Sequence, residues 1–250
     1  MSLLAMERIK FLSTRSPWWC MALAAVLSIG FTALVVGLVP AEELGAPIDT
    51  ATTQAGYLWG QMIIMVMAAL AATTEYRFNT IKTTFLAAPN RVTALLAKTA
   101  IVAVAGALVG LLLAFGSWGI SLLLASDADL ALNSGADLRA VVGVGLNAAL
   151  TAVFALAVGI LIRQSAGAIA IVLIWALLVE RILITVIPRV GDDIKNWLPL
   201  SNGDWFNAAG LAGSGTYDVG HGPWVSLLVF AAWSFGLLVI GLLVTQKRDA

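Results

Sequence analysis

Few residues in this chain of 250 could carry catalysis or hold a metal ion. It contains one cysteine, Cys20, and one histidine, His221, so it lacks the pair needed for an internal disulfide, a Cys-x-x-Cys motif or a two-histidine site. Ser214, between Gly213 and Gly215, is a conceivable nucleophile with His221 as its base. A nucleophile needs that base within hydrogen-bond reach, and a serine in a glycine-rich outer loop gives no indication of one. An intramembrane hydrolase is therefore the least supported functional hypothesis.

The neighbours of the lysines exclude a P-loop. The pattern Gly-x-x-x-x-Gly-Lys-[Ser/Thr] needs a glycine before the lysine, because backbone amides and the lysine hold the phosphates together. Isoleucine, alanine or glutamine precedes every lysine here, at Lys10, Lys82, Lys98, Lys195 and Lys247. Fourteen basic and fourteen acidic residues also argue against nucleic-acid binding, which normally brings a basic excess. We expect no catalytic residue, cofactor or metal ion on this chain.

The composition indicates which elements position the remaining polar residues. Apolar residues make up 60% of the chain and charged residues 11%, with a mean hydropathy of +0.96. Soluble domains have about 25% charged and about 45–50% apolar residues, so this chain has too few charges to cover a water-facing surface. We expect an all-α polytopic membrane protein.

Six stretches are long enough to cross a membrane, since a hydrocarbon core of about 30 Å needs about 20 mostly apolar residues. The third is long enough to tilt or to protrude. All six belong to one transmembrane domain, 1–250, which also has a connection at 75–91 and an outer loop at 188–223. The expected spans are 18–39, 55–74, 95–125, 138–162, 165–187 and 224–245.

Charge is distributed unequally between the connections. Lys and Arg resist translocation and therefore collect on the cytoplasmic side. Ten of them, with three acidic residues, lie before the first span, in the two connections after the second and fourth spans, and after the sixth. The opposite connections hold three basic and ten acidic residues, which leaves net charges of +7 and −7. We expect a multi-pass protein of the cytoplasmic membrane with both termini in the cytoplasm.

Polar groups within spans are functional candidates by default. Glu180 and Arg181 lie in the fifth span, and each costs up to about 2.5–3.5 kcal/mol near the bilayer centre, which favours facing protein or a wet cavity. We favour a structural role for them, pairing across helices or snorkelling, over substrate contact. The second span carries flexible methionines that suit a lipophilic guest, although such stripes more often serve packing. The candidates for a substrate path are Tyr57, Trp59, Gln61, Met62, Met65, Trp175 and Glu180.

Two cytoplasmic segments could make specific contacts. Residues 3–15 can form an interfacial helix, with Ala5, Met6, Ile9 and Leu12 on the apolar face, or a basic flank that only sets topology. The connection 75–91 mixes charges, aromatics and aliphatics, and can form a short helix that packs on another protein. The alternative is a solvated loop. Its contact candidates are Glu75, Tyr76, Arg77, Thr80, Ile81, Lys82, Phe85 and Arg91.

This connection resembles the cytoplasmic loop of bacterial ABC-2 type transporter permeases. Members of that family show a Glu-Tyr-Arg, Thr-Ile, Thr, Leu, Pro-x-Arg, Ala-Lys pattern there. The opening 7–19, which ends Ser-Thr-Arg-Ser-Pro-Trp-Trp, is similar to actinobacterial members. The resemblance is specific over about 25 residues and agrees in outline with the whole chain. The matching positions are Glu75, Tyr76, Arg77, Thr80, Ile81, Thr84, Leu86, Pro89, Arg91, Ala97 and Lys98.

The resemblance implies a permease subunit of an ATP-driven exporter with a type V exporter-like fold. Such a subunit dimerises, with itself or a related permease, and docks on two copies of an ATP-binding subunit that hold ATP and Mg²⁺. The 75–91 connection would be the coupling helix, 3–15 the connecting helix, and 192–222 a helical hairpin before the last span. The expected activity is efflux of a lipophilic or amphipathic substrate, such as a drug or a lipid, by alternating access.

A second class of function is an ion-coupled secondary transporter. Such proteins place coupling carboxylates or carbonyls near the membrane midplane. Glu180 is the one carboxylate within the six expected spans that could serve this purpose. Proton-driven uptake that is lost in Glu180→Gln would favour this class.

Overall fold

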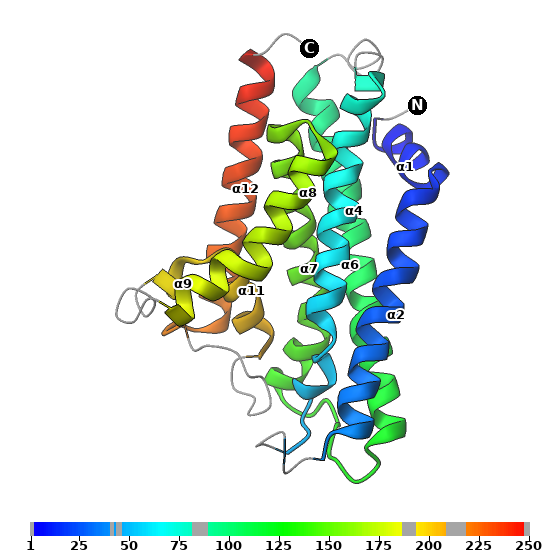
Figure 1. Ribbon diagram of the computed structural model, residues 1–250, viewed down its shortest axis with the longest axis vertical. Coiled ribbons are helices and arrows are strands. Elements are labelled where there is room, and N and C mark those ends of the chain that lie inside the picture. Colours follow the sequence, from blue (N-terminus) through cyan, green and yellow to red (C-terminus); the bar gives the residue numbers. More distant parts are fainter. Residues whose placement is uncertain are drawn as a thin grey trace.

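The computed structural model describes residues 3–40, 43, 47–81, 90–186, 194–208 and 219–247, except for the side chains of Arg181, Thr185 and Val186. Every regular element in these ranges is helical. This confirms the expected all-α class, and six helical stretches in these ranges are long and apolar enough to cross a membrane. They run side by side as an elongated bundle (Figure 1).

The spans coincide closely with the expected ranges. The first span is α2 (Arg15–Leu38), and the second is α4 (Tyr57–Arg77), preceded by the 3-10 turn η1 (Thr52–Gln54). The third is the 34-residue α6 (Arg91–Leu124), the fourth α7 (Gly135–Ile162) and the sixth α12 (Pro223–Lys247). The fifth is divided into α8 (Ser165–Ile174), a π-helical turn η2 (Trp175–Val179) and α9 (Glu180–Val186).

Helix α7 forms the centre of the bundle. It packs against α4, α6, α8 and α12, and 72% of its most apolar stretch is buried, against 22% for α2 and for α12. A capping box starts α7, in which the Ser134 hydroxyl accepts from the Asp137 backbone N–H and the Asp137 carboxylate accepts from the Ser134 backbone N–H. The two outer helices α2 and α12 expose apolar side chains, as lipid-facing helices do.

Small residues bring α6 and α7 into close contact. A Cβ added to Gly106 would lie 2.7 Å from the Ala152 Cβ and 2.9 Å from the Ala148 carbonyl oxygen. A Cβ on Gly110 would overlap the Cβ of Ala148. Residues 106 and 110 thus form a Gly-x-x-x-Gly contact inside one subunit, where only a residue without a side chain fits.

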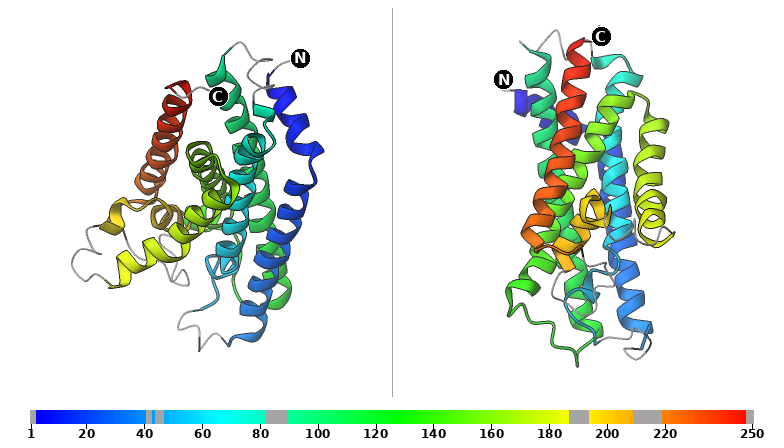
Figure 2. Two further views of the ribbon diagram at one scale, coloured as in Figure 1. Left: turned by 45° about the horizontal axis from the view of Figure 1, so that its top comes forward. Right: turned by 90° about the vertical axis from the view of Figure 1, so that its left-hand side faces the viewer.

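The outer region 188–223 contains two short helices among its described residues. These are the 3-10 turn η3 (Lys195–Trp197) and α11 (Pro199–Ala208), which packs on α7 and α12. Helix α9 bends away from the bundle axis after the π-helical turn and lies near α11 (Figure 2). Residues 187–193 and 209–218, with Ser214, lie outside the described part.

Helix α1 (Leu3–Ser13) precedes the first span, at the end of the bundle where α12 finishes (Figure 1). Its burial departs from the expected amphipathic pattern at Glu7, which was placed on the polar face. Glu7 and Phe11 are buried, whereas the apolar side chains of Leu4, Ile9 and Leu12 are about half exposed. Glu7 turns inward because it pairs with Lys98 on α6 and with Lys10 on α1, which leaves Leu4, Ile9 and Leu12 exposed.

Candidate functional site

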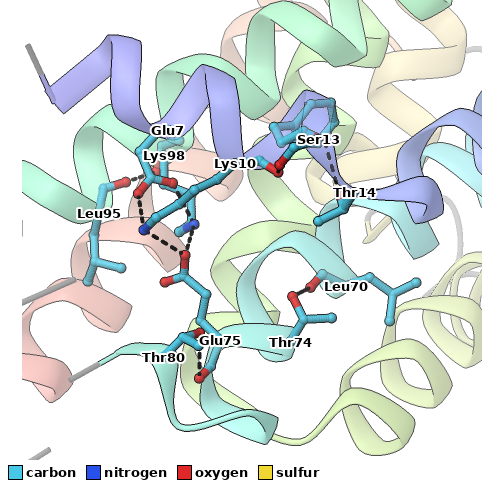
Figure 3. Close-up of polar contacts among 12 residues, drawn as sticks. Glu7, Lys10, Ser13, Thr14, Leu70, Thr74, Glu75, Thr80, Leu95 and Lys98 are labelled. Atoms are coloured by element: carbon cyan, nitrogen blue, oxygen red, sulfur yellow. Dashed lines mark hydrogen bonds and ion pairs between the residues drawn. The ribbon is translucent and has the colours of Figure 1, made fainter. Parts of the chain in front are cut away.

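Four charged side chains from three helices meet at this end of the bundle (Figure 3). The ammonium of Lys98, on the second turn of α6, donates to Glu7 Oε2 on α1 at 2.7 Å and to Glu75 Oε1 on α4 at 2.9 Å. The ammonium of Lys10 donates to Glu7 Oε1 at 3.0 Å and to Glu75 Oε1 at 3.2 Å. We call Glu7, Lys10, Glu75 and Lys98 the charge cluster.

The charge cluster is neutral and mostly buried. Exposed fractions of the side chains are 3% for Glu7, 8% for Lys98 and 11% for Glu75, while Lys10 is 37% exposed. Buried charges persist only when they are paired and hydrogen-bonded, and these two carboxylates share two ammonium groups. Burial by itself lowers the pKa of Lys10, but hydrogen bonds and attraction from Glu7 and Glu75 outweigh it and raise the pKa above its ordinary value.

Tyr76, which follows Glu75 in the chain, contacts a different part of the bundle. The guanidinium of Arg163 lies 5.1 Å from the centre of the Tyr76 ring, within the range of a cation–π interaction. Arg163 ends α7 with a left-handed backbone, φ 60°, in the two-residue turn that leads to α8. Glu75 is thus fastened to α1 and α6, while Tyr76 contacts the α7–α8 turn. The first two residues of the 75–91 connection therefore link α1 and α6 to the α7–α8 turn.

The other contact candidates of the 75–91 connection lie close to Glu75 and Tyr76 in the chain or begin α6. Arg77 lies over the Phe78 ring at 5.5 Å, the Thr80 hydroxyl donates to the Glu75 carbonyl, and Ile81 is buried. Arg91 begins α6 just after its N-cap Asn90, whose side chain accepts from the Val92 backbone N–H at 2.9 Å. Lys82 and Phe85 lie outside the described residues.

Glu180 caps a helix. Its Oε1 accepts from the Leu200 backbone N–H at 3.0 Å and the Trp175 indole N–H at 2.7 Å. Its Oε2 accepts from the backbone N–H and the hydroxyl of Ser201 at 2.8 and 2.7 Å. The carboxylate, on a residue only 3% exposed, thereby satisfies amides in the first turn of α11, where the helix dipole favours a negative charge. This structural role takes the form of a helix cap and not of an ion pair across spans.

Most of the candidates on the second span are buried in the packing of the bundle. Gln61 is buried and its side-chain amide donates to the Thr151 hydroxyl on α7 at 3.3 Å. Tyr57, Met62 and Met65 are buried as well, and Met65 belongs to the main hydrophobic core. Trp59 differs, because it is 40% exposed and stacks at an angle on Phe31 of α2, with ring centres 5.8 Å apart.

His221, the possible base of a hydrolase, takes part in local structure. Its Nε2 lies 3.0 Å from the Asn202 side-chain oxygen, and its carbonyl accepts from the Trp205 indole N–H at 3.0 Å. These contacts hold the segment before α12 against α11. The possible nucleophile, Ser214, falls outside the described residues.

Three members of the charge cluster, Glu7, Lys10 and Lys98, were not among the contact candidates that the sequence indicated for the 75–91 connection. Glu7 and Lys10 were assigned to the interfacial helix, and Lys98 was counted among the basic residues of the connection. One signal was present, since Lys98 lies three residues inside the expected third span, where a lysine needs a partner. Neither a family model nor a curated protein matches this chain.

Proposed function

We propose that the chain is the permease subunit of an ATP-driven exporter, and that the 75–91 connection transmits the movement of an ATP-binding subunit to the spans. The observation that carries the proposal is the anchoring of Glu75 and Tyr76, one to α1 and α6, the other to the α7–α8 turn. A connection that only joins two spans would not need a buried ionic junction and a cation–π contact at its first two residues.

The charge cluster is suited to transmit force. It joins the end of α4, the start of α6 and helix α1 through three ion pairs of 2.7–3.2 Å, and a fourth pair, Lys10–Glu7, lies within α1. Separating these helices would leave buried charges without partners, which costs several kcal/mol, so they are expected to move as one body. A displacement of the connection would therefore reach two spans and the surface helix together.

The proposed exporter works as a dimer, with alternating access between the two permease subunits. The Gly106-x-x-x-Gly110 motif is occupied by α7, so it is not free to join a second subunit. The apolar faces of α2 and α12 remain exposed and are available to lipid or to a second copy of the chain. ATP and Mg²⁺ would bind to the ATP-binding subunits.

The test uses the ATP-binding protein encoded next to this chain, if the adjacent reading frame carries a Walker A motif. Co-expression should give a complex whose ATP hydrolysis responds to the permease. Arg77→Ala, at the exposed start of the connection, should reduce this response, while Arg8→Ala on α1 serves as the matched control. Normal stimulation by a variant that lacks residues 76–91 would overturn the proposal.

A further inference from the structure

A cavity of about 570 Å³ lies beside the charge cluster, between α1, the start of α2, α4 and the start of α6. Its walls divide into two chemically different parts. Apolar side chains form one part, with contributions from α1, α4 and α6: Phe11, Met67, Leu70, Ala71, Ile101 and Val102. The other part contains hydroxyls and charges, and the turn between α1 and α2 places Ser13 and Thr14 opposite Leu70 and Thr74 (Figure 3).

Arg15 provides the excess charge of this cavity. Two lysines and two glutamates of the charge cluster also line it, and they neutralise one another. Arg15, the first residue of α2, is exposed and has no ion-pair or hydrogen-bond partner among the described side chains. The lining therefore carries one uncompensated positive charge next to an apolar wall, an arrangement complementary to an anionic amphiphile.

Two exposed tryptophans beside the cavity indicate that it opens at the depth of lipid headgroups. Trp18 and Trp19 follow Arg15 by one turn and are 56% and 74% exposed, and the indole of Trp18 donates to the Leu12 carbonyl of α1. Tryptophans concentrate at the boundary between headgroups and acyl chains. Basic pockets between spans at this depth bind anionic lipid headgroups.

We propose that this cavity is a binding site for one anionic phospholipid per subunit. The phosphate lies against the Arg15 guanidinium at the mouth, and an acyl chain lies along the wall formed by Leu70, Ala71 and Ile101. The cavity is smaller than a whole phospholipid, so it takes the headgroup and the first part of one chain, while the rest stays in the bilayer. The site does not depend on an ATP-binding subunit.

The experiment titrates the detergent-solubilised full chain with dioleoyl-phosphatidylglycerol and, in parallel, dioleoyl-phosphatidylcholine, and measures the first bound lipid by native mass spectrometry. The anionic lipid should bind more tightly. Arg15→Gln should weaken its binding about fivefold, because a basic residue near an anionic surface contributes about that factor. Arg15→Lys should restore most of the affinity, and Arg8→Gln, on the exposed face of α1, should leave it unchanged.

The apolar wall is tested separately. Ala71→Leu fills part of the cavity and should reduce binding of phosphatidylglycerol, while Ala33→Leu, on α2 away from the cavity, is its matched control. Glycerol phosphate, which has no acyl chain, should bind far more weakly than the lipid. Unfolding temperatures of all variants verify that each is folded.

Three kinds of result would overturn the proposal. The first is equal affinity for the anionic and the zwitterionic lipid. The second is an equal loss in Arg15→Gln and Arg8→Gln, which would indicate a diffuse attraction. The third is unchanged binding in Ala71→Leu or full affinity for glycerol phosphate, which would indicate a surface site for free phosphate.

Discussion

Replacement of Lys98 by methionine tests the importance of the charge cluster for the fold. The side chain keeps most of its length but loses the ammonium that holds Glu7 at 2.7 Å and Glu75 at 2.9 Å. Removing one partner of a buried pair costs about 3–5 kcal/mol, because the other charge stays buried. Lys10 still reaches both carboxylates, at 3.0 and 3.2 Å, so we expect the lower end, about 3 kcal/mol.

The matched control is Lys10→Met. This lysine contacts the same two carboxylates but is 37% exposed, and both of them keep Lys98. Half-exposed pairs contribute about 0–1 kcal/mol, so its loss should be small. The free energy of unfolding is measured in mixed micelles titrated with a denaturing detergent, with circular dichroism as the signal. A loss in Lys98→Met no larger than in Lys10→Met would refute the reasoning.

Three further predictions concern other helices. Gly110→Ala should destabilise the protein by about 1–3 kcal/mol through overpacking against α7, whereas Gly119→Ala, which has open space, should be neutral or slightly stabilising in the same unfolding assay. Glu180→Ala should accelerate amide hydrogen exchange in the first turn of α11, and unchanged exchange would contradict its capping role. The side-chain amide of Asn147 is fully buried and has no hydrogen-bond partner among the described residues. Asn147→Leu should therefore raise the free energy of unfolding by about 1–3 kcal/mol. A decrease would reveal a polar partner.

A dynamic consequence follows from the division of the fifth span. The π-helical turn Trp175–Val179 changes the direction of the helix just before Glu180, and π-helical turns are frequent at functional sites. The carboxylate of Glu180 then ties this bend to α11. Movements of α9 and α11 should therefore be coupled, because neither can shift relative to the other without breaking three hydrogen bonds.

The sequence alone determined the properties that depend on the composition of a continuous stretch of chain. The six helices long enough to cross a membrane followed from the lengths of apolar stretches, because the transfer of a helix into lipid depends mainly on its own residues. The pairing of Glu75 with Lys98 was not predicted, although the two residues lie at the start of the 75–91 connection and shortly after its end. The coupling role of this connection stays a prediction.

The tertiary structure decided which side chains meet. Glu7 binds Lys98 across 91 positions, and Glu180 caps a helix that begins 19 residues later. Glu7 was expected on the polar face of the interfacial helix, opposite Ala5, Met6, Ile9 and Leu12, but the charge pairing turned it inward. The physical reason is that the energy of a buried charge depends on its partner in space, and no local pattern of apolar residues records where that partner lies.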